Sequence, residues 1–332
     1  MAQRSYDYKA KNAVRDMFLG FMPPQFPAGS TGLYLPGREN LELPGFVKKG
    51  ILPVNLIGAE HDSETFAQIA SVNSGIRLYL GDLRKAVDMA EQLHFSRFVF
   101  ASLDFDGSYH TDLEDLLSVF RIFPGSPDGY MSVTSYVARD RGTVSQGVAN
   151  ILKFLSAIED PSEFYSDYGS MLRRHDAFMR FFHSKASSAR QLAWELGLLW
   201  WVVIGLSVTE IQNDGLYGRL DSGFLKRLNV PLSRIEAMAK KCSAESFFVA
   251  SSDSRLGKLL EERRCQYRVQ AFQHFAYRTQ SGQPMRTWLF YFREADPQDQ
   301  PTAREVLEDV WRLALRQPLV FLDKNGVKIT FE

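Results

Sequence analysis

The stretch that decides the fold is VNLIGAEHDS, residues 54–63, in which an apolar run stops abruptly at Glu60, His61 and Asp62. Short apolar runs bounded by polar residues are typical of buried strands, and Ser63 is a residue type that favours the N-cap of a helix. The stretch therefore predicts a strand over 54–59 and a helix over 63–72.

The same strand-then-helix unit recurs on both sides of this stretch. Strands that alternate with helices favour parallel pairing with right-handed crossovers. The sequence predicts strands at 32–36, 54–59, 76–80, 97–103 and 130–137, and helices at 5–20, 43–50, 63–72, 83–93 and 112–123. The first part of the chain is thus expected to be an α/β fold with a mainly parallel sheet.

The rest of the chain has a different pattern. Residues 144–240 have helical patterning, and strand signals return at 267–277 and 286–292, joined by a Gly-containing loop typical of a hairpin. A helix is predicted at 302–316, and an Asn-Gly pair at 325–326 indicates a second hairpin.

Composition excludes several classes of protein. The chain has 39 basic and 39 acidic residues, so it has no global attraction to polyanions or to an anionic membrane. Its two cysteines form no Cys-x-x-Cys pair, so we predict no zinc site, assign no metal ligands, and expect a reducing, cytoplasmic location. The apolar stretch 192–208 contains Glu195 and is interpreted as a buried helix rather than a membrane span. The first residues lack the apolar segment of a signal peptide.

Acidic residues follow three successive predicted strands. They are Glu60, Asp82, and the pair Asp104 and Asp106. Ligands of parallel sheets bind at the carboxyl ends of the strands, so these carboxylates are candidate ligand contacts. The alternative is that they are surface charges or cap the helices that follow, and for Asp104 and Asp106 metal binding also stays open.

The order of elements resembles the class I S-adenosylmethionine-dependent methyltransferase fold, which is Rossmann-like. That fold has five parallel strands and a terminal antiparallel pair, which the hairpin over 267–292 would supply. The resemblance implies three parts: a cofactor-binding core over 1–143, a helical insertion over 144–240, and the end of the core sheet with terminal hairpins over 241–332.

The resemblance also implies S-adenosylmethionine as the cofactor and assigns roles to residues. Pro36 and Gly37 would form the loop that approaches the cofactor, and Glu60, beside His61, would bind the ribose hydroxyls, since a carboxylate can accept two hydrogen bonds. Asp82, followed by Leu83, would contact the adenine.

The fourth predicted strand ends in DFDGSY, residues 104–109, which resembles the Asp-x-Asp-Pro-Phe-Gly segment of tRNA guanine methyltransferases without its proline. Asp104, Asp106 and Tyr109 are therefore the candidate catalytic residues.

The predicted helix over 171–194 suggests the substrate. It is locally basic, and Arg173, Arg174 and Arg180 are interleaved with phenylalanines, a combination that suits nucleic acid. The alternative is a solvated helix face. The leading hypothesis is a methyltransferase acting on DNA or RNA, and a catalytically inactive binding or assembly protein of the same fold is the alternative. A dehydrogenase is disfavoured because the first loop has one glycine where a dinucleotide site wants three. A protein partner stays open.

Overall fold

The computed structural model describes residues 7–72, 75–93, 97–105, 113–136 and 264–329, with a few positions between 177 and 206. The chain divides into two compact units. The first contains residues 1–138, 270–294 and 319–332, and the second contains residues 139–269 and 295–318.

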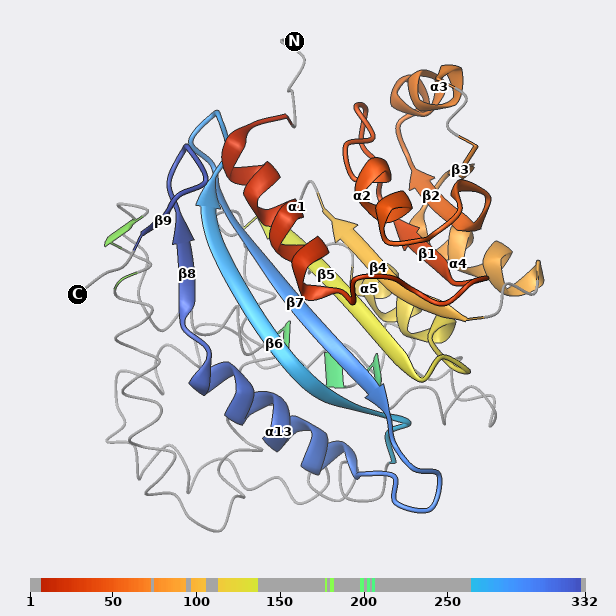
Figure 1. Cartoon of the computed structure of the whole chain (residues 1–332), viewed down its shortest axis with the longest axis vertical. Coiled ribbons are helices and arrows are strands. Elements are labelled where there is room, and N and C mark those ends of the chain that lie inside the picture. Colours follow the sequence, from red (N-terminus) through yellow and green to blue (C-terminus); the bar gives the residue numbers. More distant parts are fainter. Residues whose placement is uncertain are drawn as a thin grey trace. The chain divides into compact units, whose positions relative to one another are not determined.

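A single sheet organises the described residues (Figure 1). Its strands run in the order β3-β2-β1-β4-β5-β7-β6-β8-β9. They are β1 Thr31–Tyr34, β2 Leu56–Glu60, β3 Arg77–Leu80, β4 Phe98–Asp104, β5 Asp128–Tyr136, β6 Tyr267–Arg278, β7 Pro284–Glu294, β8 Leu319–Leu322 and β9 Lys328–Ile329.

Strand direction follows the prediction. Strands β1 to β5 pair in parallel, and β7 pairs antiparallel with β5 along its length. A tight turn at 279–283 joins β6 to β7, with Thr279 N donating to Gln283 O at 2.9 Å. The predicted α/β class, with a mainly parallel sheet and a C-terminal antiparallel hairpin, is confirmed. The last two strands extend the sheet, β8 parallel to β6 and β9 antiparallel to β8.

The described helices lie close to the predicted ranges. They are α1 Lys9–Phe21, α2 Leu43–Lys48, α3 Ser63–Ser71, α4 Leu83–Gln92, α5 Leu113–Val119 and α13 Ala303–Arg316, with 3-10 turns at Pro53–Asn55 and Phe120–Ile122. In Figure 1, α1 crosses in front of the sheet and α5 lies behind it.

Local differences from the predictions have simple causes. Asp62, not Ser63, caps α3, because its carboxylate accepts a hydrogen bond from Thr65 N at 2.8 Å. The strand predicted from residue 54 begins at Leu56, because Pro53 starts a 3-10 turn. The helix predicted over 112–123 ends at Val119 and tightens into a 3-10 turn.

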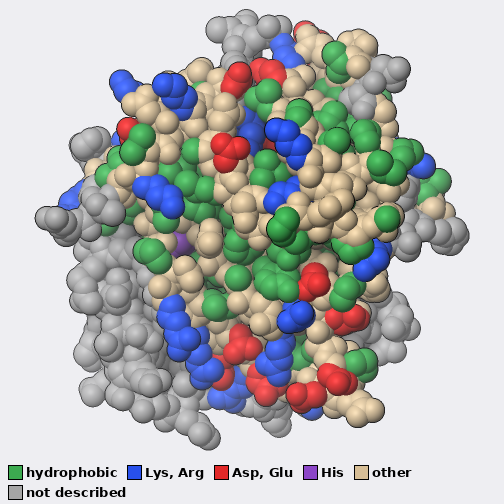
Figure 2. All heavy atoms as spheres, viewed as in Figure 1, with side chains coloured by type: hydrophobic (Ala, Val, Ile, Leu, Met, Phe, Trp, Pro, Cys, Tyr) green, Lys and Arg blue, Asp and Glu red, His purple; other side chains and the backbone are tan. Residues whose placement is uncertain are grey.

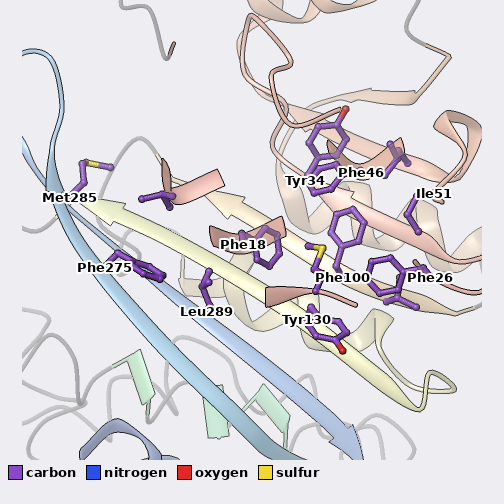
Figure 3. Packing of buried hydrophobic residues seen from close by; sticks show 14 of the residues in the cluster. Phe18, Phe26, Tyr34, Phe46, Ile51, Phe100, Tyr130, Phe275, Met285 and Leu289 are labelled. Atoms are coloured by element: carbon purple, nitrogen blue, oxygen red, sulfur yellow. The ribbon is translucent and has the colours of Figure 1, made fainter. Parts of the chain in front are cut away.

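An aromatic core joins the front of the sheet to α1 and α2 (Figure 3). The rings of Phe46 and Phe100 lie 4.3 Å apart, and Phe18 meets Phe100 edge to face. This packing holds α1 and α2 side by side over β4, which positions the site described below.

Most of the predicted insertion over 144–240 lies outside the described residues, so its extent stays a prediction. Within 192–208, six described positions are helical and buried: Leu198, Leu199, Val202, Val203, Gly205 and Leu206. Among the helices that the structure describes, none combines the length and the apolar character that a membrane span needs.

Candidate functional site

The carboxyl ends of the parallel strands form one edge of the sheet. Tyr34 at the end of β1 lies beside Gly58 of β2 and Ser102 of β4. Asp104 at the end of β4 is paired with Thr134 of β5. The sequence-predicted carboxylates of β2 and β4 therefore stand at one edge, as ligand binding by a parallel sheet requires.

The loop after β1 has an uncommon backbone. Gly37 has φ +55°, and a side chain placed on its Cα would meet nothing within 4 Å. Asn40 has φ +46° and is held by a 2.8 Å hydrogen bond that Tyr34 OH donates to its Oδ1. The buried atoms Asn40 Nδ2 and Arg38 Nη1 have no hydrogen-bond partner within the described part of the chain. Buried donors without partners are uncommon, so this loop keeps two donors whose hydrogen-bonding capacity is unused within the described residues.

Glu60 and His61 lie where β2 turns into α3. The Glu60 side chain is mostly buried, and its Oε1 accepts a hydrogen bond from Asp62 N at 2.8 Å. His61 Nδ1 lies 3.5 Å from the same oxygen, although the ring is exposed. Glu60 therefore uses one carboxylate oxygen to shape the turn, and its second oxygen makes no hydrogen bond to the residues described.

Asp82 and Leu83 begin α4. Asp82 stands at the N-cap position and is exposed, and its side chain makes no capping hydrogen bond. The carboxylate thus lies at the positive end of the helix and is open to a ligand. Leu83 and Pro36 are buried, so any contact they make with a cofactor would be apolar.

A pocket of about 420 Å³ lies in the first unit, between α1 and residues 41–48, with β4 and β5 as its floor. Asp104 lines it together with Ser102, Ser132 and Thr134. The remaining predicted site residues that the structure describes do not line it. Figure 2 shows acidic and basic side chains close together on the face where α1 lies.

Two ion pairs line this pocket. Lys11 Nζ pairs with Asp104 Oδ2, and the Lys11 side chain is 5% exposed. Arg15 Nε lies 2.7 Å from Glu42 Oε1, and Arg15 Nη1 donates to Asn12 Oδ1 at 2.6 Å. Burial alone would lower the pKa of Arg15, but the Glu42 carboxylate outweighs burial and raises it. The pocket thus holds fixed charges of both signs.

The contribution of α1 was missed at the sequence level. Lys11 is three residues before Val14 and seven before Phe18, and all three are buried, so Lys11 occupies a core position of an amphipathic helix. The sequence did contain one signal of this role, namely a lysine among the apolar residues on one face of the helix. It did not show which strands that face would cover.

Several predicted site residues lie outside the description. They are Asp106, Tyr109, Arg173 and Arg174, whereas Arg180 is described as helical and exposed. Within the described ranges, no group of three or more His, Cys, Asp or Glu side chains could hold a metal ion.

The strand order assigns the fold. Of the strands β1 to β7, arranged 3-2-1-4-5-7-6, β7 alone is reversed, and this is the class I methyltransferase arrangement that the sequence resemblance implied. No family model and no curated protein matches the chain. The chain is similar to the solved structure of the cyclopropane synthase MmaA2 from Mycobacterium tuberculosis, with 10% identity, 86% of this chain and 84% of that chain covered, and a TM-score of 0.30. The fold assignment therefore depends on the strand order and not on this likeness.

Proposed function

We propose that the chain binds S-adenosylmethionine at the carboxyl edge of β1, β2 and β3 and transfers its methyl group. The observation that carries the proposal is the loop after β1, where Gly37 has a positive φ beside open space. A glycine there lets a ligand approach the backbone closely. The nearby buried donors of Arg38 and Asn40 fit a ligand with acceptor groups.

The residues at this edge suit the parts of the cofactor. Glu60 would accept hydrogen bonds from the ribose hydroxyls, and Asp82 from the adenine amino group. The bound cofactor would supply a methyl group made electrophilic by its sulfonium. The main task of the chain would then be to hold the acceptor atom in line with the methyl group and the sulfonium. Strong acid or base groups would be less important. Asp104, which lines the floor of the pocket, would orient such an acceptor.

Nucleic acid is the acceptor that we propose, in a cytoplasmic setting. The support is the basic and aromatic composition of residues 171–194, together with the exposure of Arg180 on a helix. Cations interleaved with aromatic rings suit a polyanion whose bases can stack. The low cysteine count supports a reducing compartment.

One observation favours a second candidate, a non-catalytic protein of the same fold. Asp104 and Glu42 are already paired with Lys11 and Arg15. Carboxylates that are engaged in ion pairs are less able to bind and orient a methyl acceptor than unpaired carboxylates are. A protein that binds S-adenosylmethionine and transfers no methyl group to DNA or RNA would fit this candidate.

Titration calorimetry of the full chain with S-adenosylmethionine and S-adenosylhomocysteine tests the cofactor. A hydrogen bond to a charged group contributes about 1.5–3 kcal/mol, so Glu60→Ala should weaken affinity by roughly tenfold to a hundredfold. Glu60→Gln keeps an acceptor for Asp62 N and separates ligand binding from local folding. Glu91→Gln, at an exposed position near the end of α4, is the matched control. Unchanged affinity in both Glu60 variants would overturn this site, and binding of NAD instead would overturn the cofactor.

A salt series tests the acceptor. If DNA or RNA binds through phosphates, affinity should fall steeply with salt, because phosphate neutralisation releases counterions. Changing Arg173, Arg174 and Arg180 together to Glu should weaken binding and flatten the slope, whereas Lys85→Glu on α4 should not. Absence of any binding at low salt would remove nucleic acid as the acceptor.

A further inference from the structure

We propose that the edge strand β3 pairs antiparallel with β3 of a second copy of this chain, so that the two copies form a dimer. Strand β3 is Arg77–Leu80, and in the sheet that the structure describes its one neighbour is β2. Figure 1 shows β3 at the edge of the sheet, on the side where α3 lies. The inference goes beyond the proposed function and does not depend on it.

The backbone of β3 shows which groups a partner strand would meet. Gly81 N donates to Glu60 O of β2 at 2.9 Å, and Glu60 lies beside Leu80 in the parallel register. Alternate residues of a strand direct their backbone groups to the same side, so Tyr79 faces β2 as Gly81 does. Leu78 and Leu80 therefore direct their N–H and C=O groups away from β2, toward the edge of the sheet.

A two-fold axis at Tyr79 satisfies these outward groups together. In an antiparallel ladder, hydrogen-bonded pairs alternate with pairs that make no hydrogen bond. If Tyr79 stands opposite Tyr79 of the second copy, Leu78 of each copy stands opposite Leu80 of the other. Each of these leucine pairs exchanges both of its N–H···O hydrogen bonds. The interface is the same on both copies, so it closes as a dimer.

The side chains of this edge are complementary to themselves. Leu80 is a large apolar residue, yet it is 47% exposed. In the proposed register, Leu78 and Leu80 meet on one face of the extended sheet, and the two Tyr79 rings meet on the other face. Apolar and aromatic cross-strand pairs of this kind stabilise antiparallel sheets.

The charges at the two ends of β3 favour the antiparallel direction. Arg77 precedes the apolar residues and Asp82 follows them, and both are exposed. About the two-fold axis, Arg77 of each copy lies opposite Gly81 of the other copy and next to its Asp82, so opposite charges meet twice. A parallel arrangement would bring like charges together, and like charges on paired strands are destabilising.

The other edge of the described sheet is a poorer candidate for pairing. It is formed by β9, which consists of Lys328 and Ile329. Lysine and proline are residues that protect a strand edge against pairing with another chain. Residues 77–82 contain neither of them.

Sedimentation velocity of the full chain over a concentration series tests the dimer. We expect a reversible shift from the mass of one chain to the mass of two as concentration rises. Tyr79→Lys places two like charges opposite each other and should raise the dimer dissociation constant at least tenfold. Leu93→Lys is the matched control, since Leu93 is 51% exposed and follows α4. A monomer at every concentration, or an unchanged dissociation constant in Tyr79→Lys, would overturn the proposal.

A cysteine at the two-fold axis tests the register. Residues of a pair without hydrogen bonds have Cα atoms about 4.5 Å apart, a distance that a disulfide spans. Tyr79→Cys should therefore form a disulfide-linked dimer under mild oxidation. Leu80→Cys should cross-link far less, because its partner is Leu78. The natural chain is the control for its own Cys242 and Cys265. If Leu80→Cys cross-links as well as Tyr79→Cys does, the proposed pairing is wrong.

A charge swap tests the direction of pairing. Arg77→Glu and Asp82→Arg should each weaken the dimer about tenfold, because two attractive contacts become repulsive. The variant with both changes restores opposite charges and should bind at least threefold more tightly than either single variant. Arg77→Glu also loses the hydrogen bond from Arg77 Nε to Val54 O, but so does the double variant, so the recovery measures the charges alone. A double variant that dimerises no better than the single ones would contradict the antiparallel arrangement.

Discussion

Lys11 of α1 and Asp104 of β4 form an ion pair across 93 positions of sequence, and the lysine is almost completely buried. The pair joins the first helix to the end of the fourth strand, where the candidate catalytic segment begins. The fold and the candidate site therefore share one interaction, and its removal should affect both.

Lys11→Met should destabilise the protein. Breaking a buried pair costs about 3–5 kcal/mol because one charge is left without its partner, and Asp104 keeps 22% exposure, so we expect a loss of about 3 kcal/mol. Lys11→Met combined with Asp104→Leu should recover to within about 1 kcal/mol of the natural chain. Urea denaturation of the two single variants and the double variant measures the coupling. Additive losses would show that the pair contributes nothing specific.

Gly37→Ala should cost about 1–2 kcal/mol of stability, because an L-residue resists the left-handed backbone and no neighbouring atom adds a clash. Gly125→Ala is the matched control. Gly125 has φ +88°, equally open surroundings and a place before β5, away from the carboxyl edge.

The two glycine variants should differ in ligand binding. If the loop after β1 approaches a cofactor, Gly37→Ala should weaken S-adenosylhomocysteine binding at least tenfold, and Gly125→Ala should leave it unchanged. If titration calorimetry gives the two variants equal affinities for S-adenosylhomocysteine, Gly37 does not contribute to the cofactor site.

The sequence could predict the strands of the parallel sheet because each is an apolar run ending in polar residues. The run 54–59 and the carboxylate of Glu60 fall on β2 as expected. Parallel pairing followed from the alternation with helices, and local signals sufficed for both. The assignment of the cap to Ser63 was wrong, because Asp62 and Ser63 are both good capping residues and only the backbone shows which one accepts from Thr65.

The pocket could not be predicted, because its parts come from distant segments. Lys11 and Glu42 show no pattern in the sequence that links them to Asp104. They meet because the aromatic core of Phe18, Phe46 and Phe100 holds α1 and α2 over β4. Tertiary packing of this kind has no local signature.

The capping box of α13 predicts a pH-dependent stability. Glu305 accepts a hydrogen bond from Thr302 N at 2.7 Å, and this lowers the pKa of its carboxyl. A carboxyl with a lowered folded pKa stabilises the protein above its unfolded pKa of about 4.3, and this stabilisation is lost as pH falls through the folded value.

Glu305→Gln should therefore cost about 0.5–1 kcal/mol at pH 7, and the difference should shrink toward pH 3. We expect this small loss of stability because the Glu305 side chain is exposed. Thr302→Ala should cost about 1 kcal/mol at both pH values. Urea denaturation at pH 7 and pH 3 measures both, with the exposed Glu39→Gln as control. A loss in Glu305→Gln that is the same at both pH values would contradict the role of the charge.

Gly32 of β1 and Phe100 of β4 give the sharpest test of the packing that positions the site. They are register partners, and a Cβ on Gly32 would overlap the Phe100 ring, so Gly32→Ala must displace that ring. Overpacking a core costs about 1–3 kcal/mol. Phe100 also meets Phe46 at 4.3 Å, so a displaced ring would disturb α2 and one wall of the pocket. Phe100→Leu alone should also destabilise the protein through lost volume, yet it makes room for the new methyl group. The variant with both Gly32→Ala and Phe100→Leu should therefore lose less unfolding free energy than the two single losses added together. We expect the difference to be about 1 kcal/mol or more, since the residues are in contact. Strict additivity in denaturation would show that the ring does not fill the space above Gly32.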